Sequence, residues 1–118
     1  MRPDWVSRFY AAVDAGDGEA ALAQMAPDVE VQFGLRELAR GHEAVARTLA
    51  AVHAPLAGVR HEFRNVWGEG DTAICEFRAH YTLRRGGELT LPSLTVLEHG
   101  PEGITAMRVY IDEGPLHR

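Results

Sequence analysis

The stretch that decides the fold is TAICEFRAHYTL, residues 72 to 83. Apolar and polar side chains alternate along it, which is typical of a strand with one buried face. The expected inner face carries Ala73, Cys75, Phe77, Ala79, Tyr81 and Leu83, and the outer face carries Ile74, Glu76, Arg78, His80 and Thr82. A register slipped by one residue is the alternative. It would bring Arg78 and His80 inward but would expose Phe77 and Tyr81 to solvent.

Three further runs of period two surround this strand, at residues 59–67, 89–98 and 104–111. The turn sequences GEGD, RRGG and HGPEG separate the four runs. Because the connections are short, we expect successive strands to form antiparallel hairpins.

The N-terminal part instead shows helical spacing and helix signals. We expect a first helix capped by Asp4 and ending near Ala15, and a second short one capped by Asp17, carrying Leu22 and Met25 and ended by Pro27. A strand at 29–33 and a third helix after Gly41, with Val45, Leu49 and Val52 on its apolar side, complete the order. Helices followed by a strand meander predict an α+β fold, with the helices on one face of a curved antiparallel sheet.

The same alternation assigns inner and outer faces to the other runs. The expected inner residues are Val59, His61, Phe63, Asn65 and Trp67 in the first run, Pro92, Leu94 and Val96 in the third, and Thr105, Met107, Val109 and Ile111 in the last. The third run is ambiguous, because Leu89, Leu91 and Leu97 make its other side nearly as apolar. An outer face with Ile74, Leu91, Leu97, Ile104 and Tyr110 is too apolar for water, so we expect a homodimer through it, against the alternative of scattered surface apolar residues.

Length and composition exclude several classes of protein. The 118 residues fit one domain, 1–118, and 46% hydrophobic with 25% charged residues is the globular average. A net charge of −5 argues against nucleic acid as a partner. No apolar run is long enough for a membrane span, and the start lacks the apolar core of a signal peptide, so a cytoplasmic location is expected. The histidines show no metal-ligand spacing, the glycines form no phosphate loop, and Cys75 is expected to be inert packing.

Several stretches together carry a family resemblance across nearly the whole chain. They are RFYAAVDAGDGEAALAQMAPDVEVQF (8–33), GHEAV (41–45), NVWGEGDTAICEF (65–77), LPSLTVLE (91–98) and ITAMRVYID (104–112). In order and spacing they resemble the nuclear transport factor 2-like superfamily, and within it the SnoaL-like polyketide cyclases with their ketosteroid isomerase and limonene epoxide hydrolase cousins. The resemblance implies a cone, a cystatin-like α+β barrel in which a strongly curved antiparallel sheet wraps against three N-terminal helices and encloses a deep pocket for a small apolar molecule.

The catalytic groups of those relatives do not carry over. The tyrosine, aspartate base and second acid of the ketosteroid isomerases fall at Phe9, Phe33 and Leu94, none of which can exchange a proton. The arginine and two aspartates of the epoxide hydrolases fall at Phe77, Ala79 and Val109. The resemblance therefore implies an unusually apolar pocket and no cofactor.

Chemistry is expected from the polar residues left on the inner face. His61 is the candidate general acid or base and Tyr81 the hydrogen-bond donor to a carbonyl, the alternative being that His61 is a satisfied core histidine. The expected ligand-binding residues are Trp5, Phe9, Phe33, Phe63, Asn65, Phe77, Leu94, Met107 and Val109. The hypothesis is a binder of a small hydrophobic or aromatic metabolite, and any activity is that of a cofactor-independent isomerase, cyclase, lyase or hydrolase. The alternative is a non-catalytic dimerisation or partner-binding module whose cavity is filled by its own side chains.

Overall fold

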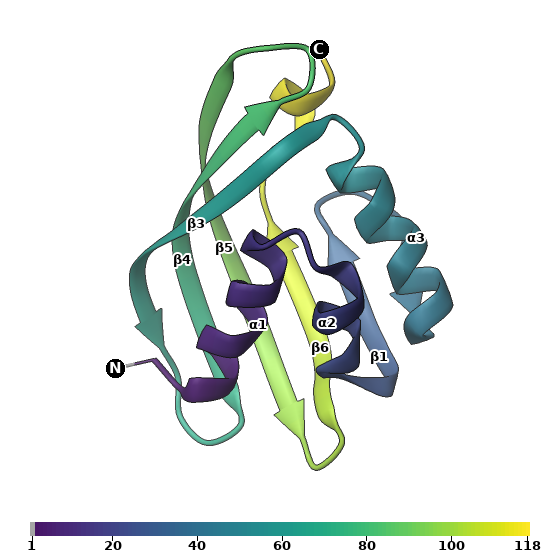
Figure 1. Ribbon diagram of the computed structural model, residues 1–118. Helices are drawn as coiled ribbons and strands as arrows, with labels where there is room; N and C mark the ends of the chain where they lie inside the picture. Colours follow the sequence, from purple (N-terminus) through teal and green to yellow (C-terminus); the bar gives the residue numbers. More distant parts are fainter. Residues whose placement is uncertain (1) are drawn as a thin grey trace.

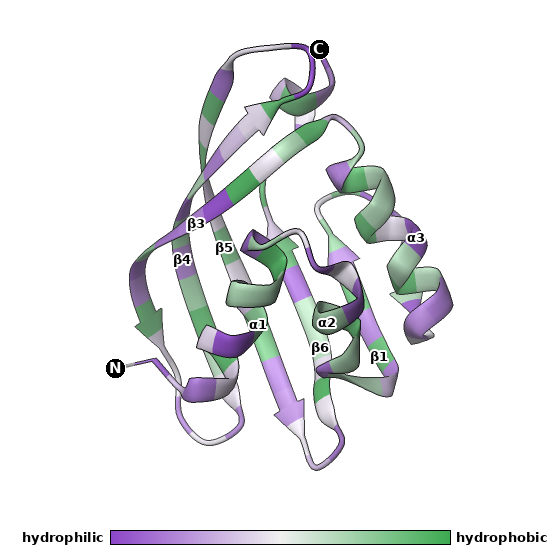
Figure 2. Ribbon diagram, in the orientation of Figure 1, coloured by the Kyte–Doolittle hydropathy of each residue, from purple (hydrophilic) through white to green (hydrophobic). Residues whose placement is uncertain are grey.

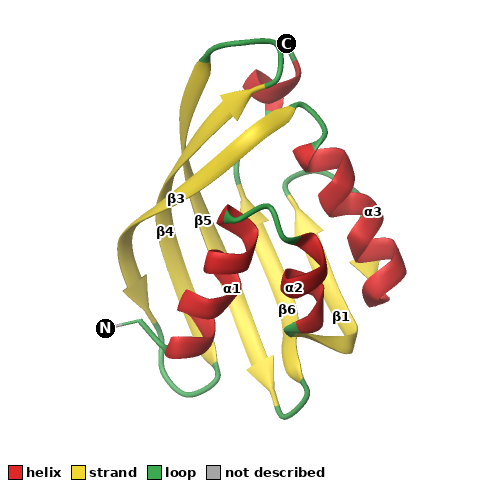
Figure 3. Cartoon of the chain, in the orientation of Figure 1, coloured by secondary structure: helices red, strands yellow, loops and turns green. Residues whose placement is uncertain are grey.

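A computed structural model describes residues 2–118 as a bent six-stranded sheet with helices on its concave side (Figure 1; Figure 3). The elements along the chain are α1 (Asp4–Asp14), α2 (Gly18–Ala23), β1 (Met25–Phe33), β2 (Ala39–Arg40), α3 (Gly41–His53), β3 (Leu56–Trp67), β4 (Thr72–Leu83), β5 (Glu88–Gly100), β6 (Gly103–Tyr110) and a 3-10 helix, η1 (Gly114–His117). The strand order is β2-β1-β6-β5-β4-β3, and the sheet is not closed. The predicted α+β class, with a curved sheet against N-terminal helices, is confirmed.

The meander from β3 to β6 is antiparallel, as predicted. One pair differs from the antiparallel prediction, because β1 runs parallel to β6 and thereby joins the meander to the N-terminal part. Met25 was assigned to the second helix, but α2 ends at Ala23 and Met25 begins β1. The first helix also starts one residue early, since Pro3 and not Asp4 is its N-cap.

Strand β4 follows the predicted alternation without interruption. Its predicted inner residues are all buried, whereas Arg78 is exposed and His80 lies half-buried on the outer face. The slipped register is therefore excluded. Figure 2 shows the resulting alternation of hydrophobic and hydrophilic positions along the strands.

Strand β3 changes face midway because of a bulge at Arg64. Phe63 is paired with Phe77 and Asn65 with Glu76, so two steps along β3 match one step along β4. A bulged residue shifts the side-chain alternation by one. The prediction that Asn65 and Trp67 face inward is consequently wrong: Asn65 Nδ2 donates to Glu76 Oε1 at 2.7 Å, Trp67 is half-exposed, and Val66 packs on the core instead.

Strand β5 buries the side opposite to the one first assigned. Ser93, Thr95 and Leu97 are buried, so Pro92, Leu94 and Val96 lie on the outer face. Leu97 and Leu91 were predicted to face outward, but Leu97 is in the core and Leu91 packs against the cluster around Tyr81. Both sides of this strand are apolar, which is why alternation did not decide between them.

The predicted faces at the start of β6 are also wrong, in this case because of a second bulge. Glu98 pairs with Ala106 and His99 with Ile104, which leaves Thr105 as an extra, bulged residue. Ile104 is therefore buried and Thr105 exposed, the reverse of the prediction, while Met107 and Val109 are buried as predicted. The apolar residues that remain on the outer face are Trp67, Ile74, Pro92, Leu94, Val96 and Tyr110.

Candidate functional site

The concave side of the sheet holds a cavity of about 530 Å³ between the helices and the strands. Its interior walls are the buried side chains of Phe9 on α1, Phe33 on β1, Val52 on α3 and Met107 on β6. Small exposed residues line the opposite, open side, namely Ala15, Gly16, Gly18, Ala50 and Ala57. The volume lies within the 300–1,000 Å³ typical of small-molecule sites.

The opening follows from the local sequence of the α1–α2 turn and the end of α3. Gly16 has φ 74°, a conformation that ends α1 and that other residues adopt only at a cost. Asp17 Oδ1 accepts from the Ala20 N–H at 3.0 Å and so starts α2, as the sequence predicted. These rim residues carry little or no side chain.

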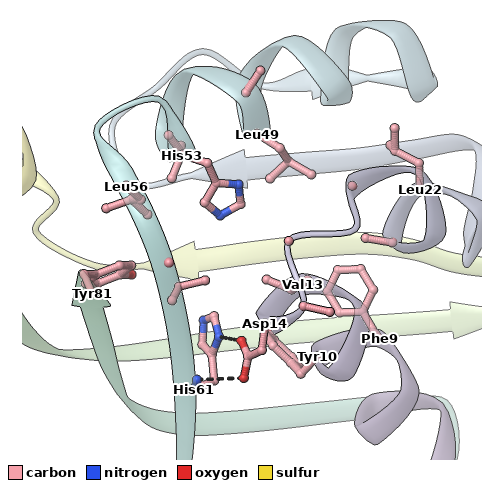
Figure 4. Close-up of a pocket in the computed structure, with 18 of the residues that line it drawn as sticks. Phe9, Tyr10, Val13, Asp14, Leu22, Leu49, His53, Leu56, His61 and Tyr81 are labelled. Atoms are coloured by element: carbon pink, nitrogen blue, oxygen red, sulfur yellow. Dashed lines mark hydrogen bonds and ion pairs between the residues drawn. The ribbon is translucent and has the colours of Figure 1, made fainter. Parts of the chain in front are cut away.

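One end of the cavity is polar and the other apolar. Figure 4 shows His53, His61 and Tyr81 at one end, coming from α3, β3 and β4, with Phe9, Val13 and Leu22 toward the other. The lining thus suits a ligand with an apolar body and one polar end.

His61 is held by Asp14, a residue 47 positions earlier in the chain that the sequence reasoning missed. The imidazole Nδ1 lies 2.6 Å from Asp14 Oδ1, and the backbone N–H of His61 donates to Asp14 Oδ2 at 2.9 Å. Nδ1 is the donor in this pair, because a carboxylate only accepts, so Nε2 is the free basic atom when the ring is neutral. Among the described residues, no side chain or backbone group hydrogen-bonds Nε2.

Aromatic neighbours fix the plane of the His61 ring. The ring centroids of Tyr10 and Phe77 lie 4.8 and 4.9 Å from that of His61. Phe77 is fully buried behind the ring, so it positions His61 rather than lining the cavity. Tyr10 packs against His61 and also contributes to the cavity wall.

Tyr10 and Tyr81 are both uncharged phenols in this environment. Burial raises the pKa of Tyr81 to about 12, with further contributions from the charges of Glu113 and Asp14. Burial likewise raises the pKa of Tyr10, and only the nearby Thr95 side chain counteracts it. The Tyr10 hydroxyl is buried without a hydrogen-bond partner of ordinary geometry among residues 2–118. Tyr81, predicted as a hydrogen-bond donor, therefore keeps its O–H proton at neutral pH.

A second hollow lies on the other side of the Asp14–His61 pair. It measures about 380 Å³ and is lined by Arg2, Ser7, Tyr10, Ala11, Asp14, His61 and Phe63. The Arg2 guanidinium stacks over the Phe63 ring at 3.9 Å from its centroid. Tyr10, Asp14 and His61 thus line both the main cavity and this hollow.

The structure brings together only part of the predicted ligand-binding set. Phe9, Phe33, Met107, His61 and Tyr81 line the main cavity. Phe63 belongs to the second hollow, and Val109 is buried in the core without lining the cavity.

Three of the predicted residues lie elsewhere. Trp5 stacks on His99 with ring centroids 4.6 Å apart. Asn65 and Leu94 lie on the outer face of the sheet, Leu94 because β5 buries its other side.

The sequence reasoning also missed His53 and several apolar lining residues. His53 is the last residue of α3, and its side chain projects into the cavity (Figure 4). Val13, Leu22, Leu49, Leu56 and Val59 complete much of the apolar lining. One signal for Asp14 was present: it is an acidic residue in the last turn of a helix, where the helix dipole disfavours negative charge, and it lies one turn from Tyr10 on the same helix face.

Comparisons with known proteins agree with this geometry. The sequence profile of the SnoaL-like domain matches residues 6–109. No curated protein sequence matches the chain at a significant level. No helix in residues 2–118 is long and apolar enough to cross a membrane.

Solved structures share the fold over most of their length. TerC co-crystallised with polyporic acid is 26% identical, with 97% of this chain and 93% of that chain covered and a TM-score of 0.81. A protein from Catenulispora acidiphila with a ketosteroid isomerase-like fold, in complex with trimethylamine, is 20% identical over 93% and 86% of the two chains with a TM-score of 0.82. An LEH-like epoxide hydrolase from M. tuberculosis is 18% identical over 92% and 80%, with a TM-score of 0.76.

Proposed function

Because the chain belongs to the SnoaL-like domain family of the NTF2-like superfamily, we propose that it binds a compact, mostly apolar small molecule and moves a proton on it through His61. The observation that carries the proposal is the 2.6 Å contact of His61 Nδ1 with Asp14 Oδ1 at the wall of the 530 Å³ cavity. A carboxylate in this position fixes the tautomer and stabilises the imidazolium that forms when Nε2 takes a proton. No cofactor is needed for this step.

The reaction that fits these groups is proton removal from a carbon beside a carbonyl. His61 Nε2 takes the proton, the C–H electron pair becomes a C=C bond, and the carbonyl π pair moves to the oxygen. Tyr81 supplies an O–H donor to that oxygen, since its phenol stays protonated. Return of the proton to another carbon completes an isomerisation, and attack of the enolate carbon on a second carbonyl completes a cyclisation.

Two observations support a ligand role for the cavity. Its volume argues against the alternative of a cone filled by its own side chains. Two solved structures of the same fold hold a small molecule, polyporic acid in one and trimethylamine in the other.

The proposal is tested with 2-tetralone, a bicyclic ketone with acidic hydrogens beside its carbonyl. The protein is mixed with it in D2O, and the loss of the α-proton signals is followed by NMR. We expect exchange above the buffer rate, and His61→Gln is expected to return it to the buffer rate while 2-tetralone still binds. Binding without accelerated exchange, or equal exchange by His61→Gln, contradicts the proton-transfer role. A chain that binds neither 2-tetralone nor related bicyclic ketones contradicts the ligand role as well.

We also propose a homodimer formed through the outer sheet face. Tyr110 and Trp67 are 59% and 50% exposed there, and Leu94 lies between Tyr110 and Glu76 in the register. The ion pairs Arg108–Glu98 and Arg40–Glu30 place both signs of charge on the strands that carry this face. A two-fold interface brings the same surface of both copies together, and a face with both signs of charge does not repel its own copy, so we take the occupant to be a second copy of this chain.

A further inference from the structure

We propose that His53 selects the ligand of this cavity: its imidazole N–H binds an oxygen acceptor on the ligand at the polar end of the cavity, the end that His61 and Tyr81 also line. The class of ligand that follows is a neutral, oxygen-bearing compound, a ketone or a phenol, of about two fused rings. This inference rests on the proposed function, since it concerns the same cavity, and it adds the residue that sets specificity.

Accounting for the polar lining singles out His53. Asp14 and His61 bind each other, and Arg84 Nε donates to the Ala54 carbonyl at 3.2 Å, which caps the C-terminal end of α3. The Arg84 side chain is exposed, so this cation lies at the rim. The Tyr10 hydroxyl has no partner among residues 2–118, but that atom is fully buried and does not face the cavity space. His53 and Tyr81 also line the cavity, and in the same part of the chain neither side chain has a hydrogen-bond partner in the protein. Polar groups that protein atoms leave unsatisfied at a cavity wall are available to water or to a ligand.

The placement of His53 gives it a role distinct from that of His61. Figure 4 shows the His53 ring projecting from the end of α3 into the same space that His61 and Tyr81 reach from β3 and β4. An oxygen bound by His53 and Tyr81 therefore lies at the end of the cavity where Nε2 of His61 is free. A ligand carbon next to that oxygen is then the one presented to the base.

The charge of the surroundings favours a neutral ligand. Burial lowers the pKa of His53, and repulsion from His61 lowers it further, so the imidazole is uncharged at neutral pH. The other ionisable groups that line this cavity are Asp14, His61, Tyr10, Tyr81 and Arg84. Asp14 is the carboxylate among them, and the one cation of fixed charge among the described lining residues, Arg84, lies at the rim, so a carboxylate ligand inside the cavity would lose its hydration beside a like charge.

The size and lining of the cavity determine the apolar body of the ligand. The side chains beyond the polar end are Phe9, Val13, Leu22 and Leu49. They offer an aromatic ring and branched aliphatic groups from three helices, which pack well on a flat ring system.

The test compares three ligands with the same bicyclic skeleton: indane, 1-indanone and indane-1-carboxylate. Dissociation constants are measured by NMR titration at pH 7.5. We expect wild type to bind 1-indanone roughly two- to tenfold more tightly than indane, the worth of one neutral hydrogen bond, and to bind the carboxylate most weakly. His53→Phe keeps the ring volume but has no donor, so we expect it to bind indane as before and to lose the preference for the ketone. His53→Gln, whose amide can donate, is expected to retain part of it.

A matched control is Leu49→Met, one helical turn before His53 on the same face. It changes the cavity shape without touching a polar group, so both affinities are expected to change together. The proposal is overturned if His53→Phe keeps the ketone preference, if it loses both ligands equally while its fold is intact by circular dichroism, or if wild type prefers indane or the carboxylate. The two proposals can fail separately. If His61 still exchanges the α-protons of 2-tetralone but the ketone preference does not depend on His53, the proposed function stands and this inference alone is wrong.

Discussion

Asp14 closes two hydrogen bonds onto a single residue, His61: one from the backbone N–H at 2.9 Å and one from the ring at 2.6 Å. The backbone bond holds the carboxylate at a fixed position on β3, so the ring bond has little freedom to vary. A side chain on the last residue of α1 thereby determines how the imidazole on β3 is oriented.

Asp14→Asn is expected to reduce the exchange of 2-tetralone by roughly 10- to 100-fold. The amide offers one acceptor oxygen to the two N–H donors of His61 that the carboxylate holds, and it does not stabilise the imidazolium. Positioned acid–base groups contribute roughly 10²–10⁴-fold to rates. The NMR exchange rate and the dissociation constant are measured together, and affinity is expected to change by less than threefold. Asp17→Asn, a nearby capping aspartate outside the cavity, serves as the control. An unchanged rate in Asp14→Asn would show that His61 acts without its partner.

The stability of the protein is expected to fall as the pH drops from 7 to 5, in part because of His53. The pKa of His53 in the folded protein lies below the ordinary 6.5 of histidine, so the unfolded chain takes up a proton before the folded chain does. The two states bind equal numbers of protons at His53 well above pH 6.5. As the pH falls through 6.5 toward the lower pKa of the folded state, the unfolded state binds more, and the free energy of unfolding falls. Urea unfolding at pH 7.5, 6.5 and 5.5 should show a flatter profile for His53→Phe than for wild type. Parallel profiles would contradict the buried, neutral state of His53.

Glu113 links the loop after β1 to the C-terminal 3-10 helix. Arg36 donates to both of its carboxylate oxygens, and His117 hydrogen-bonds it at 2.8 Å. Burial alone raises the pKa of Glu113, but the hydrogen bonds and charges of Arg36 and His117 outweigh it, and the net pKa lies below the ordinary 4.5. The stabilisation of the folded protein by the Glu113 carboxylate is thus present above pH 4.5 and is lost as the pH falls through the pKa of Glu113 in the folded protein.

Glu113→Gln is accordingly expected to lower the free energy of unfolding by about 1 kcal/mol at pH 7, a value reduced for the partly exposed Arg36. At pH 3 the difference in stability between the variant and wild type should be smaller. The measurement is chemical denaturation at the two pH values. A loss of the same size at both would mean that packing, and not the ion pair, is the cause.

Leu116 is a buried residue from the very end of the chain. It is 0% exposed and belongs to a cluster with Leu56, Ala79, Tyr81 and Leu83. Leu116→Ala is therefore expected to cost about 2–4 kcal/mol of stability through lost burial and the cavity left behind. Arg118→Ala, an exposed position two residues on, is the control and should be neutral. Thermal and urea unfolding measure both, and a neutral Leu116→Ala would show that the 3-10 helix is dispensable for the Tyr81 side of the core.

If the dimer forms through the outer face of the sheet, a charged substitution on that face should dissociate it into monomers. Leu94→Arg places a charge between Tyr110 and Glu76, where a second copy would bury it. Sedimentation velocity should give a dimer for wild type and a 13.0 kDa monomer for Leu94→Arg. Ala51→Arg on the exposed side of α3 should remain dimeric. A monomeric wild type at high micromolar concentration contradicts the proposal.

The sequence predicted best where one strand face is clearly more apolar than the other. Strand β4 meets that condition at every position, so its bounds and its faces were predicted correctly. Strand β5 has apolar residues on both sides, because one side packs on the core and the other forms the outer apolar surface, and the alternation could not decide between them.

The candidate site was predicted only in part because its parts come from distant elements. The alternation of β3 was sufficient to place His61 inside. Asp14 and His53 lie at the C-terminal ends of two helices, and nothing in their own segments indicates that the chain brings both to His61. Asn65 was misplaced because a strict period of two was continued past Arg64, although two consecutive polar residues before the apolar Val66 mark the bulge there.

The bulge at Arg64 divides β3 into two halves of opposite parity. From Val59 to Phe63 the odd-numbered side chains face the helices, and after Arg64 the even-numbered Val66 does so. A scan of every substitution along this strand should therefore show sensitivity that switches from odd to even positions at residue 64. Deleting that one residue would place Asn65 directly after Phe63, so β3 would pair with β4 without a bulge while Asn65 stays on the outer face and Val66 stays on the core.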